Sequence, residues 1–202
     1  PVKQVFTKHG KTLSIVVLAV ILHDLSFYML FTYMPTFMTT QLHLTESVAF
    51  TINTINLFLV CVFTVLGAWL SDKIGRKTVM ATAAMIFIVG TIPLFSIMSN
   101  TTDMMTIFWA QLIFAIAAGG YFGPTAAMMV EAFPTAIRFS AIAITTNISG
   151  PLFGGTVGVI VTYLIDKTGS KMIPAFYLTG IAIISLIALR FIRMHDKEKA
   201  SP

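Results

Sequence analysis

Long apolar runs, separated by short polar connections, dominate the chain. A helix that crosses a bilayer needs about 20 mostly apolar residues, because hydrocarbon leaves every backbone polar group to be satisfied within the helix itself. Six runs meet that length, which predicts an all-α membrane protein with six transmembrane helices. The runs cover residues 13–38, 47–70, 78–98, 104–130, 140–165 and 173–193, and the connections between them lie at Gln41–Glu46, Ser71–Lys77, Ser99–Asp103, Glu131–Phe139 and Asp166–Lys171.

Lysine and arginine are distributed unevenly between the two ends of these spans. Of the 13 basic residues, only Lys167 and Lys171 fall on one side, and the rest fall on the other. Cytoplasmic connections carry the excess of positive charge in membrane proteins. Both termini of this segment and the connection Ser71–Lys77 are therefore expected on the cytoplasmic side, at a bacterial inner membrane.

Composition supports this assignment and narrows the function. The chain is 56% hydrophobic and 10% charged, with a mean hydropathy of +0.88, which is well beyond the range of a soluble domain. The net charge of +5 is explained by topology, since no basic patch is interleaved with exposed polar sequence as in nucleic-acid binding. The single cysteine, Cys61, allows no intrachain disulfide, and no metalloprotease, hydrolase or phosphate-loop motif indicates an enzyme.

Glycines gather around prolines in the fourth and fifth spans. Small residues four apart let two helices approach closely, and proline removes a backbone donor and kinks a helix. These positions indicate close packing, a hinge, or both. They are Gly119, Gly120 and Gly123 before Pro124, and Gly150, Gly154 and Gly158 around Pro151.

The connection between the second and third spans, "AWLSDKIGRK" (Ala68–Lys77), is unusually rich in charge. Asp72 can cap the next helix or accept from Arg76 four residues on, and Gly75 supplies a tight turn. The simplest interpretation is a positive-inside anchor. The stretch also resembles the loop signature of the major facilitator superfamily, small-x-x-x-Asp-Arg/Lys-x-Gly-Arg/Lys-Arg/Lys, although glycine is usual at the first position and Gly67 here lies one place early. The matching residues are Ala68, Asp72, Lys73, Gly75, Arg76 and Lys77.

The resemblance implies twelve spans in two six-span halves, with this connection between the second and third spans of each half. The chain is therefore expected to be the C-terminal half of such a transporter, with an N-terminal six-span half as its partner. Residues 1–12 would be the cytoplasmic linker, residues 13–193 the six-helix half and residues 194–202 a cytoplasmic tail. Three further stretches, Phe27–Pro35, Glu131–Ser149 and Met172–Leu178, resemble the metabolite:proton symporter branch, and most closely the proline/betaine transporters.

The same resemblance implies that the charged connection is part of a gate. Asp72 would meet the positive end of a helix from the other half, and Arg76 would pair with an acid at the end of a neighbouring span, for which Glu131 is the candidate. Arg138 belongs to the same predicted gating region. Charges at the interfacial end interact more strongly than in bulk water, and these contacts exist only while the two halves are closed there.

Two ionisable side chains, His23 and Asp24, lie near the middle of the first span. Such groups cost several kcal/mol in a membrane and often mark a substrate pathway or a proton relay. Alternatively, Asp24 is paired with a polar group of another span and only packs. Packing is the more natural interpretation for His23, because adjacent residues on a helix point apart.

Other polar and aromatic residues of the spans are candidates for the same pathway. Asp24 shares a helical face with Tyr28 and Phe31, and aromatic walls suit a secondary or quaternary ammonium group. Interhelical hydrogen bonding and packing explain most such residues without function. The candidates are Tyr28, Phe31, Trp109, Phe114 and Tyr121 among the aromatic residues, and Asn53, Asn56, Gln111, Thr145, Thr146 and Asn147 among the polar ones.

The leading hypothesis is a proton-coupled symporter of a zwitterionic osmolyte such as proline or glycine betaine, working by alternating access. It requires no cofactor, with the proton as coupling ion, and its partners are the other half, the substrate and the lipid bilayer. Two alternatives stay open. The chain can be a six-span structural or assembly subunit without transport activity, or a symporter of another small metabolite such as a carboxylate.

Overall fold

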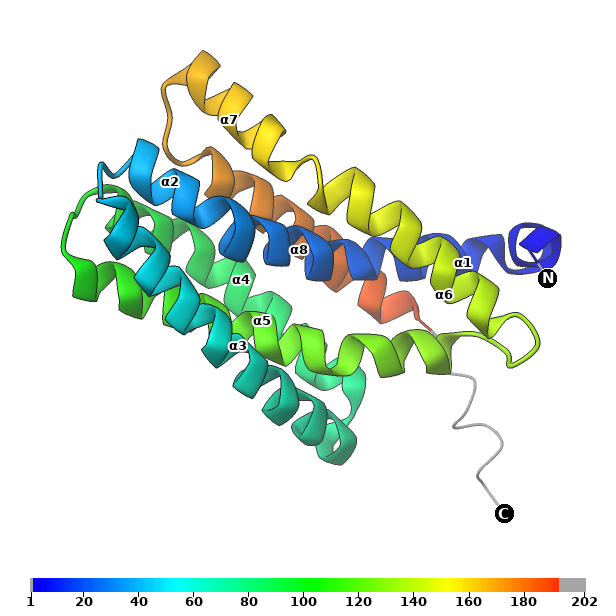
Figure 1. Cartoon of the computed structure of the whole chain (residues 1–202). Helices are drawn as coiled ribbons and strands as arrows, with labels where there is room; N and C mark the ends of the chain where they lie inside the picture. The colour runs from blue at the N-terminus through cyan, green and yellow to red at the C-terminus, as the bar shows by residue number, and fades with distance from the viewer. Residues whose placement is uncertain (1, 193–202) are drawn as a thin grey trace.

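The structure, a computed structural model, describes residues 2–192 and consists of helices that run back and forth along one axis (Figure 1). Six helical stretches in this part of the chain are long and apolar enough to cross a membrane, which confirms the prediction. The predicted tail 194–202 lies outside the described residues. The elements are α1 Val2–Phe27, η1 Tyr28–Tyr33, α2 Met34–Thr40, α3 Glu46–Ile74, α4 Arg76–Ser99, α5 Met104–Ala132, α6 Arg138–Ser149, η2 Gly150–Gly154, α7 Val157–Thr168 and α8 Ile173–Phe191.

The first span is longer than its apolar run. Helix begins at Val2 and continues through η1 and α2 to Thr40, with a kink at His9, where φ is −125° and ψ is 16°. Hydropathy marks only the part of a helix that suits hydrocarbon, and no proline lies between residues 2 and 34 to end the helix earlier. The predicted linker is therefore largely helical, and its cytoplasmic location stays a prediction.

Two spans contain a π-helical segment, in which each turn holds an extra residue. In the first span it is η1, and in the fifth it is η2, which begins at Gly150 and contains Pro151. The fifth span, Arg138–Thr168, is consequently built from two 12-residue helices, α6 and α7, on either side of η2 and a short turn. The sequence predicted a kink at Pro151 but gave no indication of η1.

Helices α3 and α5 are in backbone contact. A Cβ atom added at Gly119 would lie 2.6 Å from the backbone carbon of Phe63 and 2.8 Å from the amide nitrogen of Thr64. One added at Gly67 would lie 2.6 Å from the carbonyl oxygen of Gly119. Close packing of the fourth-span glycines is thus confirmed, and Gly67 provides the close approach although Ala68 holds the position where the family usually has glycine.

Helix α1 runs through the middle of the molecule and is fixed by hydrogen bonds to its backbone. The buried hydroxyl of Tyr121 on α5 donates to the carbonyl of Ala19 at 2.7 Å, and Ser185 on α8 donates to the carbonyl of Leu18, also at 2.7 Å. These two bonds lie about one turn before His23 and Asp24. They therefore set the depth and rotation of α1 at the point where its ionisable residues occur.

The connections alternate between the two ends of the bundle. The connections after α2, α4 and α7 gather at one end, whereas the N-terminus and the connection between α5 and α6 lie at the other (Figure 1). The turn between α3 and α4 belongs to this second end, because Arg76 contacts Glu131 near the end of α5. Within residues 2–192, the two ends therefore separate the basic residues as the sequence predicted, whichever end faces the cytoplasm; Arg193, Lys197 and Lys199 lie outside the described residues.

Candidate functional site

Asp24, on the first span, is hydrogen-bonded to the fifth span close to the point where each span becomes π-helical. It lies on α1 shortly before η1, and its Oδ2 accepts a hydrogen bond from the hydroxyl of Ser149, the last residue of α6. Ser149 is buried, whereas Asp24 is half-buried. The carboxylate thus has a partner in another span, as the packing interpretation required, yet it keeps access to the surface of this chain.

The two π-helical segments are in direct contact beside this carboxylate. A Cβ atom at Gly154 of η2 would lie 2.8 Å from Cε2 of Tyr28, the first residue of η1, so the tyrosine ring rests on the glycine backbone. A π-turn also leaves carbonyl groups without their usual helical donors, and such segments are frequent at functional sites. The carbonyl of Phe31 in η1 accepts from Nδ2 of the buried Asn53 on α3 at 3.0 Å, whereas Oδ1 of Asn53 has no hydrogen-bond partner among the described residues.

Several aromatic rings lie on the residues next to Asp24 in the first span and on α5. His23 packs on Phe122 with ring centroids 4.4 Å apart, and its buried Nδ1 has no hydrogen-bond partner among the described residues. Phe27 lies 5.8 Å from Tyr28 and 6.0 Å from Phe31 between ring centroids. Phe27 and Tyr28 are 40% and 37% exposed, so this aromatic surface beside Asp24 is open in the isolated chain.

Several predicted pathway residues lie elsewhere or have a local role. Gln111 donates to Sδ of Met38 at 3.1 Å, and Trp109 is 58% exposed beside Phe108. Both are 11 to 13 residues before Phe122 on α5, about 16–20 Å along the helix axis. The structure does not bring them to Asp24.

The other predicted residues make contacts within the core or with their own helix. Phe114 stacks on Phe87 at 6.3 Å, and Tyr121 is the buried donor to α1 described above. Asn56, Thr145, Thr146 and Asn147 each donate to a carbonyl of their own helix, and Asn147 and Thr146 are exposed on α6.

Sequence reasoning did not single out Ser149, Gly154 as the seat of Tyr28, or Phe122. In the sequence, Ser149 before Gly150 and Pro151 looks like an ordinary residue of an apolar helix. Its proximity to Asp24 becomes visible only in the fold. Phe122 is one of 17 phenylalanines, and nothing in its neighbourhood distinguishes it in the sequence. The informative feature available was Gly150–Gly154 around Pro151, which marks the place where α6 ends.

Arg76 joins three helices at the charged end of the bundle. Its Nε lies 2.5 Å from Oε1 of Glu131 on α5, and its Nη1 lies 2.8 Å from Oδ1 of Asp72 on α3. The predicted pairing of Arg76 with Glu131 is therefore confirmed. Asp72 accepts from Arg76 and does not cap α4, whose N-terminal flanking residue is Gly75 with φ of +96°, a conformation that favours glycine.

The remaining basic residues of this region have separate partners. The Nζ of Lys73 lies 3.8 Å from the centroid of the Trp69 ring, and Nε of Arg138 donates to the carbonyl of Phe133 at 3.2 Å. The ammonium of Lys77 donates to the carbonyl of Ile192 at the end of α8. The Asp72 side chain stays 64% exposed beside a hollow of about 270 Å³ bordered by Ser71, Gly75 and Glu131.

Comparison with known proteins agrees with the resemblance that was found in the sequence. Residues 16–202 match the profile of the Major Facilitator Superfamily. The chain is 35% identical over 189 residues to the ectoine/proline transporter ProP of Corynebacterium glutamicum, which covers 93% of this chain and 37% of that protein. It is 32% identical over 194 residues to the glycine betaine/proline/ectoine/pipecolic acid transporter OusA of Dickeya dadantii, covering 95% of this chain and 38% of that protein. It is 32% identical over 186 residues to the proline/betaine transporter of Escherichia coli, covering 92% and 37%. The chain thus spans well under half the length of these relatives.

Proposed function

Because the chain belongs to the Major Facilitator Superfamily, we propose that it is the C-terminal half of a membrane transporter that carries a zwitterionic osmolyte. The family and the named relatives indicate a transporter and not an enzyme. The relatives' names specify ectoine, proline and glycine betaine, which combine a cationic nitrogen with a carboxylate. A second six-span half completes the transporter, and the bacterial inner membrane with both termini of this segment in the cytoplasm is the proposed location.

The observation that carries the proposal is the carboxylate of Asp24 at the junction of two π-helical segments, beside exposed aromatic rings. A cationic nitrogen is attracted both by a carboxylate and by the faces of aromatic rings. Phe27 and Tyr28 provide such faces on the part of the surface where Asp24 is accessible. Our proposal is that the substrate's cationic nitrogen binds here, with its carboxylate directed toward the second half.

Asp24 also has the chemistry needed for proton coupling. An ionised carboxylate only accepts hydrogen bonds, whereas a protonated one donates as well. Its bond from Ser149 links the state of the carboxylate to the end of α6, where the regular helix gives way to η2. Gain or loss of one proton would thus change how the first and fifth spans hold each other, which is the coupling that a symporter requires.

The charged end supplies the proposed gate. Arg76, Asp72 and Glu131 form one network, and the exposed oxygen side of Asp72 is available to the N-terminus of a helix from the second half. The contact would hold one side shut while the site around Asp24 opens to the other. Alternating access follows if the network breaks when the halves rock apart.

The test is uptake by the full-length protein in proteoliposomes. Labelled proline, glycine betaine and ectoine are compared with succinate, with and without an inward proton gradient, and empty liposomes serve as the control. We expect at least one zwitterion to enter and to accumulate only with the gradient. Uptake of succinate alone would favour the carboxylate alternative, and no uptake of any compound would favour a structural subunit.

A further inference from the structure

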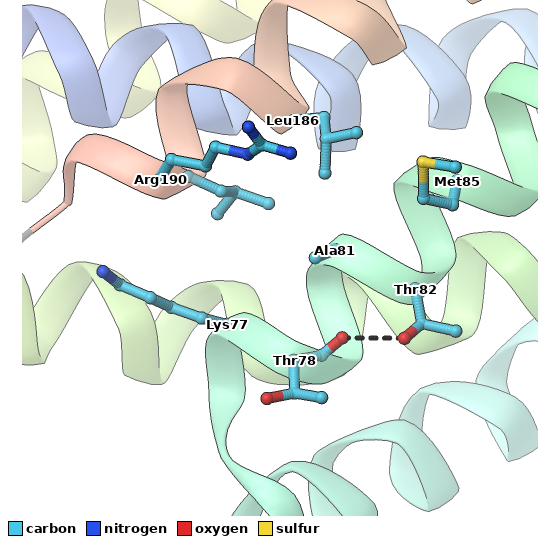
Figure 2. Close-up of a pocket in the computed structure, with 8 residues that line it drawn as sticks. Lys77, Thr78, Ala81, Thr82, Met85, Leu186 and Arg190 are labelled. Atoms are coloured by element: carbon cyan, nitrogen blue, oxygen red, sulfur yellow. Dashed lines mark hydrogen bonds between the residues drawn. The ribbon is translucent and has the colours of Figure 1, made fainter.

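A groove of about 620 Å³ separates α4 from α8 at the charged end of the bundle (Figure 2). Lys77, Ala81 and Met85 line it from α4, and Leu186 and Arg190 line it from α8. Lys77 is the last residue of the charged connection Ala68–Lys77, but none of the lining residues belongs to the Asp24 site or to the network of Arg76 with Asp72 and Glu131. The groove between α4 and α8 therefore lies outside both proposed working parts of the transporter.

Two cationic side chains line opposite walls of the groove. Figure 2 shows the Arg190 guanidinium projecting from α8 above Ala81 toward Leu186, whereas the Lys77 side chain on the facing helix extends the other way. Lys77 uses one proton for the carbonyl of Ile192, and within residues 2–192 no acceptor is bonded to Arg190. No lining residue is acidic, so the positive charge of this end is not neutralised by the groove itself.

Apart from the two cations and the threonines Thr78 and Thr82, the residues that line the groove are apolar. Met85 and Leu186 stand opposite each other where the groove leads toward the middle of the helices (Figure 2). The exposed side chains that follow on the same two helices are also apolar, including Val89 on α4 and Ile183 and Ile187 on α8. This face has the composition of a surface in contact with lipid.

We propose that this groove binds one anionic phospholipid of the phosphatidylglycerol type. Its phosphate lies between Lys77 and Arg190, and one acyl chain follows Ala81, Met85 and Leu186. Basic residues near a membrane surface attract anionic lipids, and arginine pairs well with phosphate through its planar set of donors. A free phosphate would leave the apolar part of the groove unused, and a zwitterionic lipid would bring no net charge to the two cations.

The first test counts lipids retained by the purified full-length protein in native mass spectrometry. Phosphatidylglycerol and phosphatidylcholine with identical acyl chains are added in parallel. We expect selective retention of phosphatidylglycerol. Arg190→Gln should reduce the affinity for this lipid about fivefold, which is the typical contribution of one basic residue near an anionic membrane surface. Arg190→Lys should keep most of the binding, and Lys11→Gln, which removes an exposed charge from α1 outside the groove, should leave it unchanged.

The second test locates the lipid in otherwise unchanged protein. A photoreactive benzoylphenylalanine replaces Met85, or Ile97 near the far end of α4 as the matched control, since both positions are about equally exposed at 47% and 49%. Capture of phosphatidylglycerol in preference to phosphatidylcholine is expected at position 85 and not at position 97. Equal capture of both lipids, displacement by inorganic phosphate, or crosslinking to a second protein chain would each overturn the proposal.

Discussion

The two sides of the bundle are built differently. Helices α3, α4 and α5 are single α-helices of 29, 24 and 29 residues, and α3 and α5 meet backbone to backbone. The first and fifth spans are instead interrupted by η1 and η2, which meet through the ring of Tyr28. We conclude that the α3–α5 contact is a fixed support, whereas the contact between the first and fifth spans can rearrange.

Both contacts, between α3 and α5 and between the first and fifth spans, depend on a glycine, so their glycines can be compared directly. At Gly119 the neighbouring atoms are Cβ and backbone atoms of Phe63 and Thr64 on α3, which cannot move without separating two helices. At Gly154 they belong to an aromatic side chain, which can turn about its own bonds. A rigid frame and a deformable site therefore coexist in one six-helix unit, and the candidate site lies in the deformable part.

The largest effect is expected from Gly119→Ala, which adds a methyl group to the fixed contact. The new Cβ would meet the backbone of Phe63 at 2.6 Å, so α3 and α5 must separate, at a cost of about 3 kcal/mol in the free energy of unfolding. Thermal denaturation of the full-length protein measures it. Gly180→Ala is the matched control, because no atom beyond the neighbouring backbone of its own helix lies within 4 Å of its Cβ position, and it should not destabilise. Equal stability of both variants would mean that the α3–α5 contact is not a rigid support.

The second-largest effect is expected at the charged end of the bundle, where α3, α4 and α5 are joined by Arg76. Asp72→Asn removes one of the two carboxylates on Arg76 and the proposed contact with the second half, which should shift the protein toward the state that is open at this end by about 1–3 kcal/mol. Electron-resonance distances between the two halves at the charged end report the shift. Asp166→Asn makes the same chemical change in an exposed residue at the other end of the bundle and should leave the distances unchanged. An unaltered distribution in Asp72→Asn would remove the gate.

A smaller and different effect is expected at the deformable contact. Gly154→Ala places a methyl group 2.8 Å from Cε2 of Tyr28, and the ring can swing away, so we expect nearly normal stability. The displaced ring disturbs the site next to Asp24. The transport rate should therefore fall about tenfold, which corresponds to about 1.4 kcal/mol in activation free energy. Gly150→Ala, with no atom within 4 Å of its Cβ position, is the control in both assays. A large loss of stability with normal transport would reverse the assignment of the two sides.

The smallest effect is expected where α5 begins. Asp103 accepts from the amide and the hydroxyl of Thr106 at 2.8 and 2.7 Å, and these bonds hold the pKa of its carboxyl below the ordinary value of 3.8. The folded state therefore binds this proton more weakly than the unfolded chain, so the stabilisation is present above pH 3.8 and is lost as the pH falls through the lower pKa.

Asp103→Asn provides the measurement, since asparagine keeps a capping oxygen but does not titrate in this range. The difference in melting temperature between the two proteins should be constant at neutral pH and should change only in the acid range. A difference that varies around neutral pH would contradict this account of the start of α5.

The regular part of the fold could be predicted from the sequence, and the irregular part could not. Length and hydropathy located all six spans, and the resemblance of the charged connection to the family's loop signature implied the pairing of Arg76 with Glu131. The start of the first helix at Val2 was missed because polar residues continue a helix without contributing to hydropathy. The π-helical segment η1 was missed because an extra residue in a turn is stabilised by contacts with α3 and the fifth span, which no local pattern records.

The candidate site was predicted only in part, for the same reason. Asp24 could be found because a carboxylate inside an apolar run is costly and therefore conspicuous. Ser149, 125 residues later, could not be found, because serine is common in transmembrane helices and its role depends on where α6 ends. Trp109 and Gln111 share the residue types of a pathway, but their position along α5 separates them from Asp24.

The central claim is that Asp24 is the functional carboxylate of the transporter, and Asp24→Asn in proteoliposomes tests it most directly. Exchange of labelled substrate across the membrane and accumulation against a gradient are measured on the same preparation, with Asp166→Asn as the control. The account predicts that accumulation is lost in Asp24→Asn. Intact exchange would identify Asp24 as the coupling residue, and weakened substrate affinity in exchange would identify it as the partner of the ammonium group. Wild-type exchange together with wild-type accumulation would contradict the claim and leave Asp24 as a structural partner of Ser149.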